Sequence, residues 1–199
     1  MIIIGGGSAG CATVLSLYKN TVRASCLIID DANPSSFKAS QLKYIAVYIS
    51  SLKTFCLQIG ESLPPESGRL LQYLHPSLPK HLSSRVESGI YTLCTGNASA
   101  WSSSVLEERH AIFNPFGHGL HLNRADFDEV LKNTVVNCAS ESNSRLLFEK
   151  GRFKGIHRNE KGLWNVEMED DKGVRKNFVA KWVVDATGRK ASVATKVCH

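Results

Sequence analysis

The chain has 199 residues, of which 43% are hydrophobic and 21% are charged. This composition supports a packed core and excludes a largely disordered chain. The net charge of +6 comes from scattered Lys and Arg residues without a dense basic block, which argues against a nucleic-acid-binding protein. The six cysteines form no Cys-x-x-Cys pair, so we expect reduced thiols, and neither they nor His118 and His121 predict a metal site.

The start of the chain carries no targeting signal. Met1 opens directly into an apolar run, without a charged leader or a cleavage site. No apolar run reaches the length of a membrane span. We therefore expect a soluble, cytoplasmic protein.

Residues 1–30 predict a strand, a helix and a second strand. An apolar run leads into Gly5-x-Gly7-x-x-Gly10, then into a small, apolar helical segment at 11–18 and a second apolar run that ends at Asp30. In this pattern the first glycine permits a tight turn, the second lets the backbone approach a pyrophosphate, and the third lets the helix pack closely on the sheet. The helix N-terminus attracts phosphate, and the acid accepts hydrogen bonds from ribose hydroxyls. The unit predicts an adenine-dinucleotide site, and by itself it does not separate FAD from NAD.

The middle of the chain is less regular. Turn-forming residues fill 31–36, and residues 37–58 place apolar side chains at mixed spacing that fits either a strand or a poor amphipathic helix. Residues 60–65 (GESLPP) predict a proline-rich turn, 67–74 a short helix and 79–83 another turn. Residues 91–101 alternate in polarity around Gly96.

The second half predicts one helix and several strands. Residues 110–122 predict strand, turn and strand, and 123–139 repeat apolar residues at helical spacing behind Asn123, a suitable N-cap. Short strands are expected at 146–149, 153–157, 164–169 and 176–179, with a hairpin turn at 170–173. A buried-type strand at 181–185 ends in Asp185. The alternation of strands and helices predicts an α/β protein.

Three further segments carry residue types suited to a cofactor site. The run Asp185-Ala186-Thr187-Gly188-Arg189 follows an apolar strand, so it brings a carboxylate and a glycine to the sheet edge where cofactors bind. The others are the turn at 60–65 and the helix start at 122–124. Each has a plainer alternative: a strand-to-loop exit, a rigid surface turn, and a capped helix with a solvated arginine.

Taken together, these segments resemble the FAD-dependent monooxygenases and halogenase-like oxidoreductases, a superfamily that includes the aromatic hydroxylases and the flavin-dependent tryptophan halogenases. The resemblance is strongest to the halogenase-like branch, which carries a Gly-Glu-Ser-x-Pro-Pro turn. It covers nearly the whole chain, and its further motifs are Cys94-x-Gly96, Ser99-x-Trp101, Phe113-Asn114-Pro115-x-Gly117-x-Gly119, Leu122-x-Arg124-x-x-Phe127-Asp128 and Asp185-Ala186-Thr187-Gly188-Arg189. It implies a Rossmann-like FAD-binding fold, with a parallel or mixed sheet flanked by helices, plus an additional antiparallel β segment.

The resemblance also implies a set of cofactor-binding residues and no metal. They are Gly5, Gly7, Ser8, Ala9, Gly10, Asp30, Glu61, Ser62, Arg124, Asp185 and Gly188. By resemblance, the glycine turn contacts the FAD pyrophosphate, Asp30 the adenosine ribose, and Arg124 the flavin or its phosphates. The turn at 61–62 runs near the flavin, and the 185–188 segment is a second cofactor motif. No catalytic residue is implied.

The sequence departs from the family pattern in three ways. It ends after the Asp185 motif, where family members continue with a Gly-Asp segment and a substrate domain, so we expect residues 1–199 to form the N-terminal portion of an FAD/NAD(P)-binding domain, with the substrate domain absent or partial. Within 37–58, residues 39–58 match no family element, which fits an insertion or a retained non-coding segment. Residues 92–95 lack the lysine of tryptophan halogenases.

These features predict an FAD-binding, monooxygenase-like oxidoreductase that uses reduced flavin and oxygen on a small organic substrate. NAD(P)H or a partner flavin reductase would supply the electrons. One alternative is a halogenase-like protein. The other is a truncated, non-catalytic dinucleotide-binding remnant, because flavin chemistry must be shielded from water and the expected substrate domain is missing.

Overall fold

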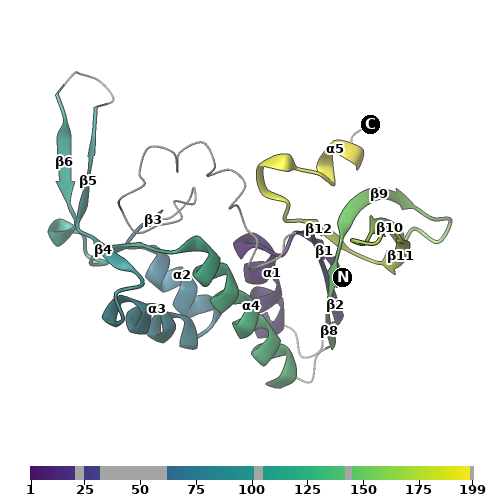
Figure 1. Cartoon of the computed structure of the whole chain (residues 1–199), viewed down its shortest axis with the longest axis horizontal. Coiled ribbons are helices and arrows are strands. Elements are labelled where there is room, and N and C mark those ends of the chain that lie inside the picture. Colours follow the sequence, from purple (N-terminus) through teal and green to yellow (C-terminus); the bar gives the residue numbers. More distant parts are fainter. Residues whose placement is uncertain (21–24, 32–61, 101–104, 142–144, 198–199) are drawn as a thin grey trace. The chain divides into compact units, whose positions relative to one another are not determined.

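The structure, a computed structural model, describes residues 1–20, 25–31, 62–100, 105–141 and 145–197 (Figure 1). The chain divides into two compact units. The first consists of Met1–Phe37 and Leu131–His199, and the second of Lys38–Val130. Among the described residues, no helix is long and apolar enough to cross a membrane.

The first unit is built on a four-stranded parallel sheet with the strand order β12-β1-β2-β8. Its strands are β1 (Ile2–Ile4), β2 (Ser25–Asp30), β8 (Arg145–Lys150) and β12 (Val183–Asp185). In the register of the sheet, Ile4 lies opposite Ile29 on one side and Asp185 on the other. The carboxyl ends of β1, β2 and β12 are therefore level, and the loops that follow these strands share one edge.

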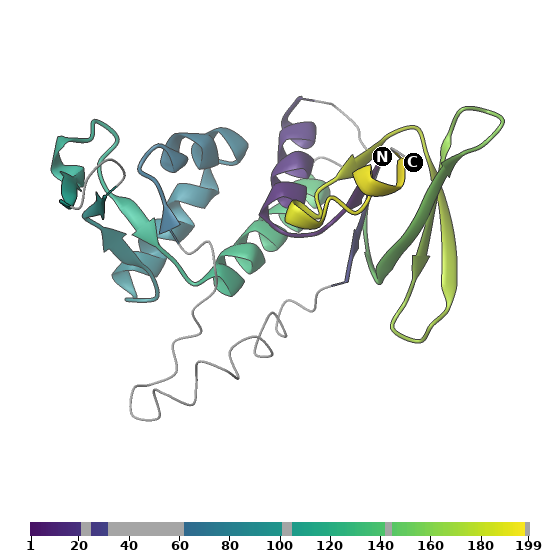
Figure 2. The ribbon, with the colours of Figure 1, turned by 90° about the horizontal axis from the view of Figure 1, so that it is seen from above.

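Helix α1 (Ser8–Asn20) covers one face of this sheet (Figures 1 and 2). Its buried residues recur at helical spacing: Gly10, Cys11, Val14, Leu15 and Tyr18. A Cβ on Gly10 would collide with the carbonyl oxygen of Gly5, so the missing side chain lets the helix and the loop after β1 approach closely.

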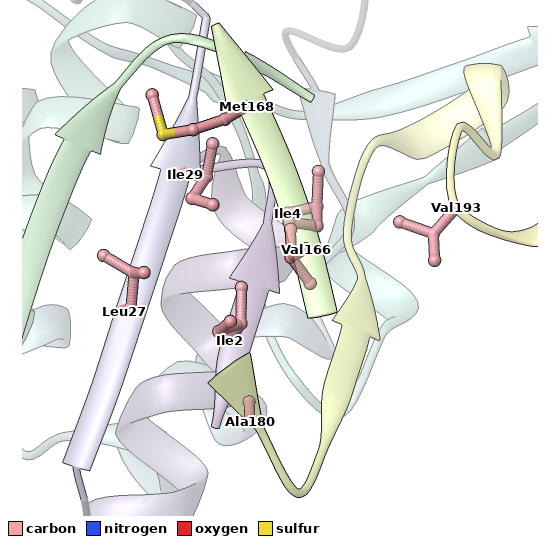
Figure 3. Packing of buried hydrophobic residues seen from close by; sticks show 8 residues of the cluster. All are labelled: Ile2, Ile4, Leu27, Ile29, Val166, Met168, Ala180 and Val193. Atoms are coloured by element: carbon pink, nitrogen blue, oxygen red, sulfur yellow. The ribbon is translucent and has the colours of Figure 1, made fainter. Parts of the chain in front are cut away.

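A three-stranded antiparallel sheet covers the other face (Figure 2). It consists of β9 (Arg152–Arg158), β10 (Trp164–Glu169) and β11 (Arg175–Ala180). Side chains from the two sheets and Val193, from the segment before α5, form a buried cluster whose members are shown in Figure 3: Ile2, Ile4, Leu27, Ile29, Val166, Met168, Ala180 and Val193. The coverage on both faces fits the continuous apolar runs of β1, at 2–4, and of the middle of β2, at 26–29.

The chain leaves β12 through a short 3-10 helix, η4 (Gly188–Lys190), and ends in α5 (Ala194–Val197). Helix α4 (Arg124–Glu141) carries the chain from the second unit into the first. Asn123 caps α4, because its Oδ1 accepts hydrogen bonds from the N–H groups of Ala125 (3.0 Å) and Asp126 (3.4 Å).

The second unit combines helices with short antiparallel strands. Its elements are β3 (Ser62–Leu63), α2 (Ser67–Leu74), α3 (Ser77–Glu87), β4 (Thr92–Cys94), β5 (Gly96–Ser99), β6 (Glu107–His110), the 3-10 helix η3 (Ala111–Phe113) and β7 (Gly119–His121). Strand β7 lies between β3 and β4, and β5 pairs with β6. Helices α2 and α3 bury Leu71, Leu74, Leu78 and Leu82.

A polar network ties α3 to the start of α4 within the second unit. The Arg85 guanidinium binds both carboxylate oxygens of Asp126, at 2.9 Å and 3.0 Å. The buried Tyr91 hydroxyl donates to Asp126 Oδ2 at 2.6 Å. Burial and the bond to Asp126 together raise the pKa of Tyr91. The tyrosine therefore remains neutral and acts as a donor.

Most of the predicted elements are confirmed, including the helix at 67–74 and the hairpin between β10 and β11. The predicted turn at 79–83 is wrong, because these residues lie inside α3. Pro79 is in the first turn of this helix, where a missing N–H removes no intrahelical bond. The strand expected just after His110 is instead η3. Residues 37–58, and 32–36 of the predicted turn, lie outside the described residues.

Candidate cofactor-binding site

The candidate site lies at the carboxyl edge of the parallel sheet, where the loops after β1 and β12 are joined. The Gly5 N–H donates to the carbonyl of Ile29 at 2.8 Å. The Ala186 N–H donates to the carbonyl of Ile4, also at 2.8 Å. These bonds continue the sheet beyond the last strand residues, so both loops start from fixed backbone positions.

Two glycines of the loop after β1 are required by the protein's own packing. Gly5 has a φ of +107°, a conformation that side chains rarely adopt, and a Cβ there would collide with the carbonyl of Ala186. A Cβ on Gly10 would collide with the carbonyl oxygen of Gly5. Both positions are therefore explained by close backbone approach within the first unit.

Gly7 is different, because the protein itself gives no steric reason for its missing side chain. A Cβ there would meet nothing within 4 Å, and Gly7 is not among the residues with positive φ. Its carbonyl accepts the Cys11 N–H at 3.0 Å, the first hydrogen bond of α1. Open space thus adjoins the N-terminus of a 13-residue helix, which attracts anions.

The start of α1 fits a pyrophosphate. Ser8 and Ala9 form the first turn together with Gly10, and no acidic side chain is present in that turn. First-turn N–H groups have no intrahelical acceptor, so they are the donors that phosphate oxygens use at helix N-termini. The residues present therefore fit the phosphate part of a dinucleotide.

Asp30 is the last residue of β2, and its carboxylate approaches the glycine loop. A Cβ on Gly6 would lie 2.5 Å from Asp30 Oδ2. Lys132 of α4 donates to the same oxygen at 3.2 Å, and the side chains of Lys132 and Asp30 are only 18% and 19% exposed. Sequence reasoning missed both Gly6 and Lys132. The run of three glycines was an available signal for Gly6, whereas no pattern pointed to Lys132.

Asp185 uses both carboxylate oxygens within its own loop. Oδ1 accepts from the Thr187 N–H (3.0 Å) and hydroxyl (2.6 Å), and Oδ2 accepts from the N–H groups of Val193 (2.9 Å) and Ala194 (3.0 Å). Burial alone would raise the pKa of Asp185, but these hydrogen bonds outweigh it and lower the pKa. The carboxylate therefore shapes the loop and holds the start of α5.

Gly188 is explained by backbone conformation. Its φ is +65°, and a Cβ there would meet nothing within 4 Å.

The structure brings together eight of the predicted residues in the first unit: Gly5, Gly7, Ser8, Ala9, Gly10, Asp30, Asp185 and Gly188.

Two further predicted residues, Ser62 and Arg124, belong to the second unit. Ser62 lies in β3, where its hydroxyl is 2.8 Å from His121 Nδ1. Arg124 is the first residue of α4, and its Nε donates to Asp128 at 3.0 Å. Glu61 lies outside the described residues. Among the residues that the structure describes, no cluster of His, Cys, Asp and Glu could hold a metal ion.

No family sequence model matches the chain, and no curated protein sequence matches it either. Solved structures do match. A triple mutant of the flavin-dependent brominase Bmp2 has a TM-score of 0.67 at 20% identity, over 98% of this chain and 40% of that one. The p-nitrophenol 4-monooxygenase PnpA from Pseudomonas putida has a TM-score of 0.64 at 15% identity, over 98% and 42%. The myxobacterial chondrochloren halogenase CndH, described as an FAD-dependent halogenase, has a TM-score of 0.63 at 18% identity, over 98% and 38%.

The chain has the fold of the FAD-dependent halogenases and monooxygenases. The predicted α/β, FAD-binding fold class is therefore confirmed. The chain spans about two-fifths of the length of these neighbours, as expected for a partial match to the family. At these identities the likeness extends to the fold, and the chemistry has to be argued from the site.

Proposed function

We propose that this chain binds FAD and belongs to a monooxygenase-like oxidoreductase that acts on a small organic substrate with reduced flavin and oxygen. The observation that carries the proposal is the open space at Gly7, beside the N-terminus of α1. Packing explains Gly5 and Gly10, whereas the space beside Gly7 is free and would admit a phosphate at the N-terminus of α1. FAD-dependent neighbours with this fold support FAD as that ligand.

The chain's own residues would bind and orient the cofactor. The backbone at 7–10 would donate to the pyrophosphate, and Asp30 would accept hydrogen bonds from the adenosine ribose. Asp185 would act indirectly, by holding the loop at 186–188 level with the glycine loop. When bound, the flavin supplies the redox chemistry, with NAD(P)H or a partner flavin reductase as the electron source.

Halogenation is the second candidate, because halogenases are among the structural neighbours. Against it stands the sequence of β4 and the residue after it, Thr92–Thr95, which has no lysine where the tryptophan halogenases carry one. We therefore favour oxygenation of an organic substrate.

The test is a titration of the purified chain with FAD, followed by flavin fluorescence and by the visible absorption bands. We expect saturable binding of FAD and much weaker binding of FMN, because FMN lacks the adenosine half that Asp30 would contact. A chain that binds neither flavin contradicts the proposal. FAD binding with no oxidation of NAD(P)H by the chain alone, and no oxygenated product when an added flavin reductase supplies the electrons, would favour the non-catalytic dinucleotide-binding alternative.

The same preparation separates the two reactions. If the loaded protein, supplied with NAD(P)H and a flavin reductase, converts a phenolic substrate to an oxygenated product in the absence of halide, oxygenation is supported. A strict requirement for chloride or bromide, with a halogenated product, would instead support the halogenase.

A further inference from the structure

Lys132 is a charged residue that the proposed function leaves without a role. It lies in α4, 102 positions from Asp30 in the chain, and its Nζ is 3.2 Å from Asp30 Oδ2. Both side chains are less than one-fifth exposed. A lysine so far withdrawn from water is costly unless it is paired, so this position requires a specific carboxylate.

The backbone of Asp30 is already fixed without Lys132. Asp30 is paired in β2, and its carbonyl accepts the Gly151 N–H at 2.9 Å. What remains to be set is the direction of the carboxylate. Gly6 allows the carboxylate to approach the glycine loop, because a side chain there would collide with Asp30 Oδ2. Lys132 attracts that same oxygen from α4.

We propose that Lys132 is a positioning residue, which orients the Asp30 carboxylate so that it can accept hydrogen bonds from the ribose hydroxyls of an adenine nucleotide. The inference rests on the proposed function and adds a residue to the ribose subsite. Lys132 itself does not contact the ribose in this scheme. It lowers the cost of binding by holding Asp30 in one orientation before the ligand arrives.

The experiment measures binding of ADP and of 2′,3′-dideoxy-ADP to the full chain. The two ligands share the adenine and the pyrophosphate and differ only in the ribose hydroxyls. The variants are Lys132→Met, which keeps the length but removes the charge, and Lys132→Arg, which keeps the charge. Lys154→Met is the matched control, because Lys154 forms a comparable ion pair with Glu169, at 2.9 Å, between β9 and β10.

We expect Lys132→Met to weaken ADP binding by about tenfold, as when the group that orients a binding residue is removed. Dideoxy-ADP should bind the variant and the wild type almost equally, because Asp30 then has no hydroxyl to accept from. Lys132→Arg should retain most of the affinity for ADP, and Lys154→Met should bind both ligands as the wild type does.

Two outcomes overturn the inference while the proposed function stands. One is an unchanged affinity of Lys132→Met for ADP. The other is an equal loss for ADP and dideoxy-ADP, which is what a purely structural ion pair would give. A wild-type chain that binds neither FAD nor ADP contradicts the proposed function, and the ligand role of Lys132 with it. A double-mutant cycle with Asp30→Asn on unfolding stability would then still show whether the pair is energetically coupled.

Discussion

The carbonyl of Ala186 occupies the space that a side chain on Gly5 would need. These two residues are the first to follow β1 and β12, neighbouring strands of the parallel sheet. Their contact joins the glycine loop to the loop that Asp185 organises. The two sequence motifs are therefore parts of one structure, although about 180 residues separate them in the chain.

Gly5→Ala should destabilise the first unit. The new methyl group would collide with the carbonyl of Ala186, at a φ that alanine rarely adopts. We expect a loss of more than about 2 kcal/mol in the free energy of unfolding. Urea denaturation followed by circular dichroism measures this, and a midpoint equal to that of the wild type would contradict the packing described here.

Gly7→Ala should separate folding from binding. Its methyl group meets nothing within 4 Å, so we expect a change in the free energy of unfolding of at most about 1 kcal/mol, the usual cost of alanine at a helix N-cap. The same methyl group occupies the space proposed for the pyrophosphate. A misplaced methyl in a close contact costs about 1–3 kcal/mol, which corresponds to about a fivefold to 150-fold rise in the Kd for FAD.

Fluorescence titration with FAD measures that second effect. A Gly7→Ala variant that folds normally and binds FAD as tightly as the wild type would contradict the pyrophosphate site proposed beside Gly7. Because Gly5→Ala is expected to fail in folding first, it serves as the contrasting variant.

Asp185→Asn should change how stability depends on pH. Hydrogen bonds keep the pKa of Asp185 below its ordinary value of 3.8 in the folded protein. The carboxylate therefore contributes its full stabilisation above that value, and the contribution is lost as the pH falls through the lower, folded-state pKa. An asparagine has no such titration, so the variant should lose less stability than the wild type as the pH falls below about 4.

The Asp185→Asn variant should also have a lower free energy of unfolding than the wild type near neutral pH. The amide nitrogen of asparagine cannot accept the bonds that one carboxylate oxygen now receives, which costs about 1–3 kcal/mol. Thermal melts across the pH range report both effects. Parallel curves for variant and wild type would show that these bonds do not lower the pKa of Asp185 in the folded protein.

Tyr91→Phe and Asp126→Ala should differ in their cost to the second unit. Tyr91→Phe removes one hydrogen bond and leaves Asp126 paired with Arg85, so we expect a loss of about 1–2 kcal/mol. Asp126→Ala leaves the buried Tyr91 hydroxyl without this acceptor and Arg85 without its pair, and we expect about 3 kcal/mol or more.

Chemical denaturation of the two variants measures this difference. Combined in one chain, the substitutions should cost less than the sum of their separate effects, because they remove the same bond. Additive losses would show that Tyr91 and Asp126 act independently.

Local patterns predicted much of the fold correctly. The alternation and turn residues at 164–179 were enough for the hairpin of β10 and β11, and Asn123 marked the start of α4. These elements depend on interactions between residues that are close in sequence, so local sequence patterns predict them. The prediction failed at Pro79, where a proline read as a turn residue lies in the first turn of α3.

The candidate site likewise combines features that local sequence patterns predict with features that depend on the tertiary structure. The glycine spacing by itself determined that the chain holds a strand, a tight turn and a helix suited to a dinucleotide. Only the tertiary structure decided which glycine serves packing and which leaves open space, that Asp185 is engaged by its own loop, and that Lys132 reaches Asp30. Those facts arise where strands and helices distant in sequence come together, because close packing and ion pairing depend on distances in space, and no local pattern encodes them.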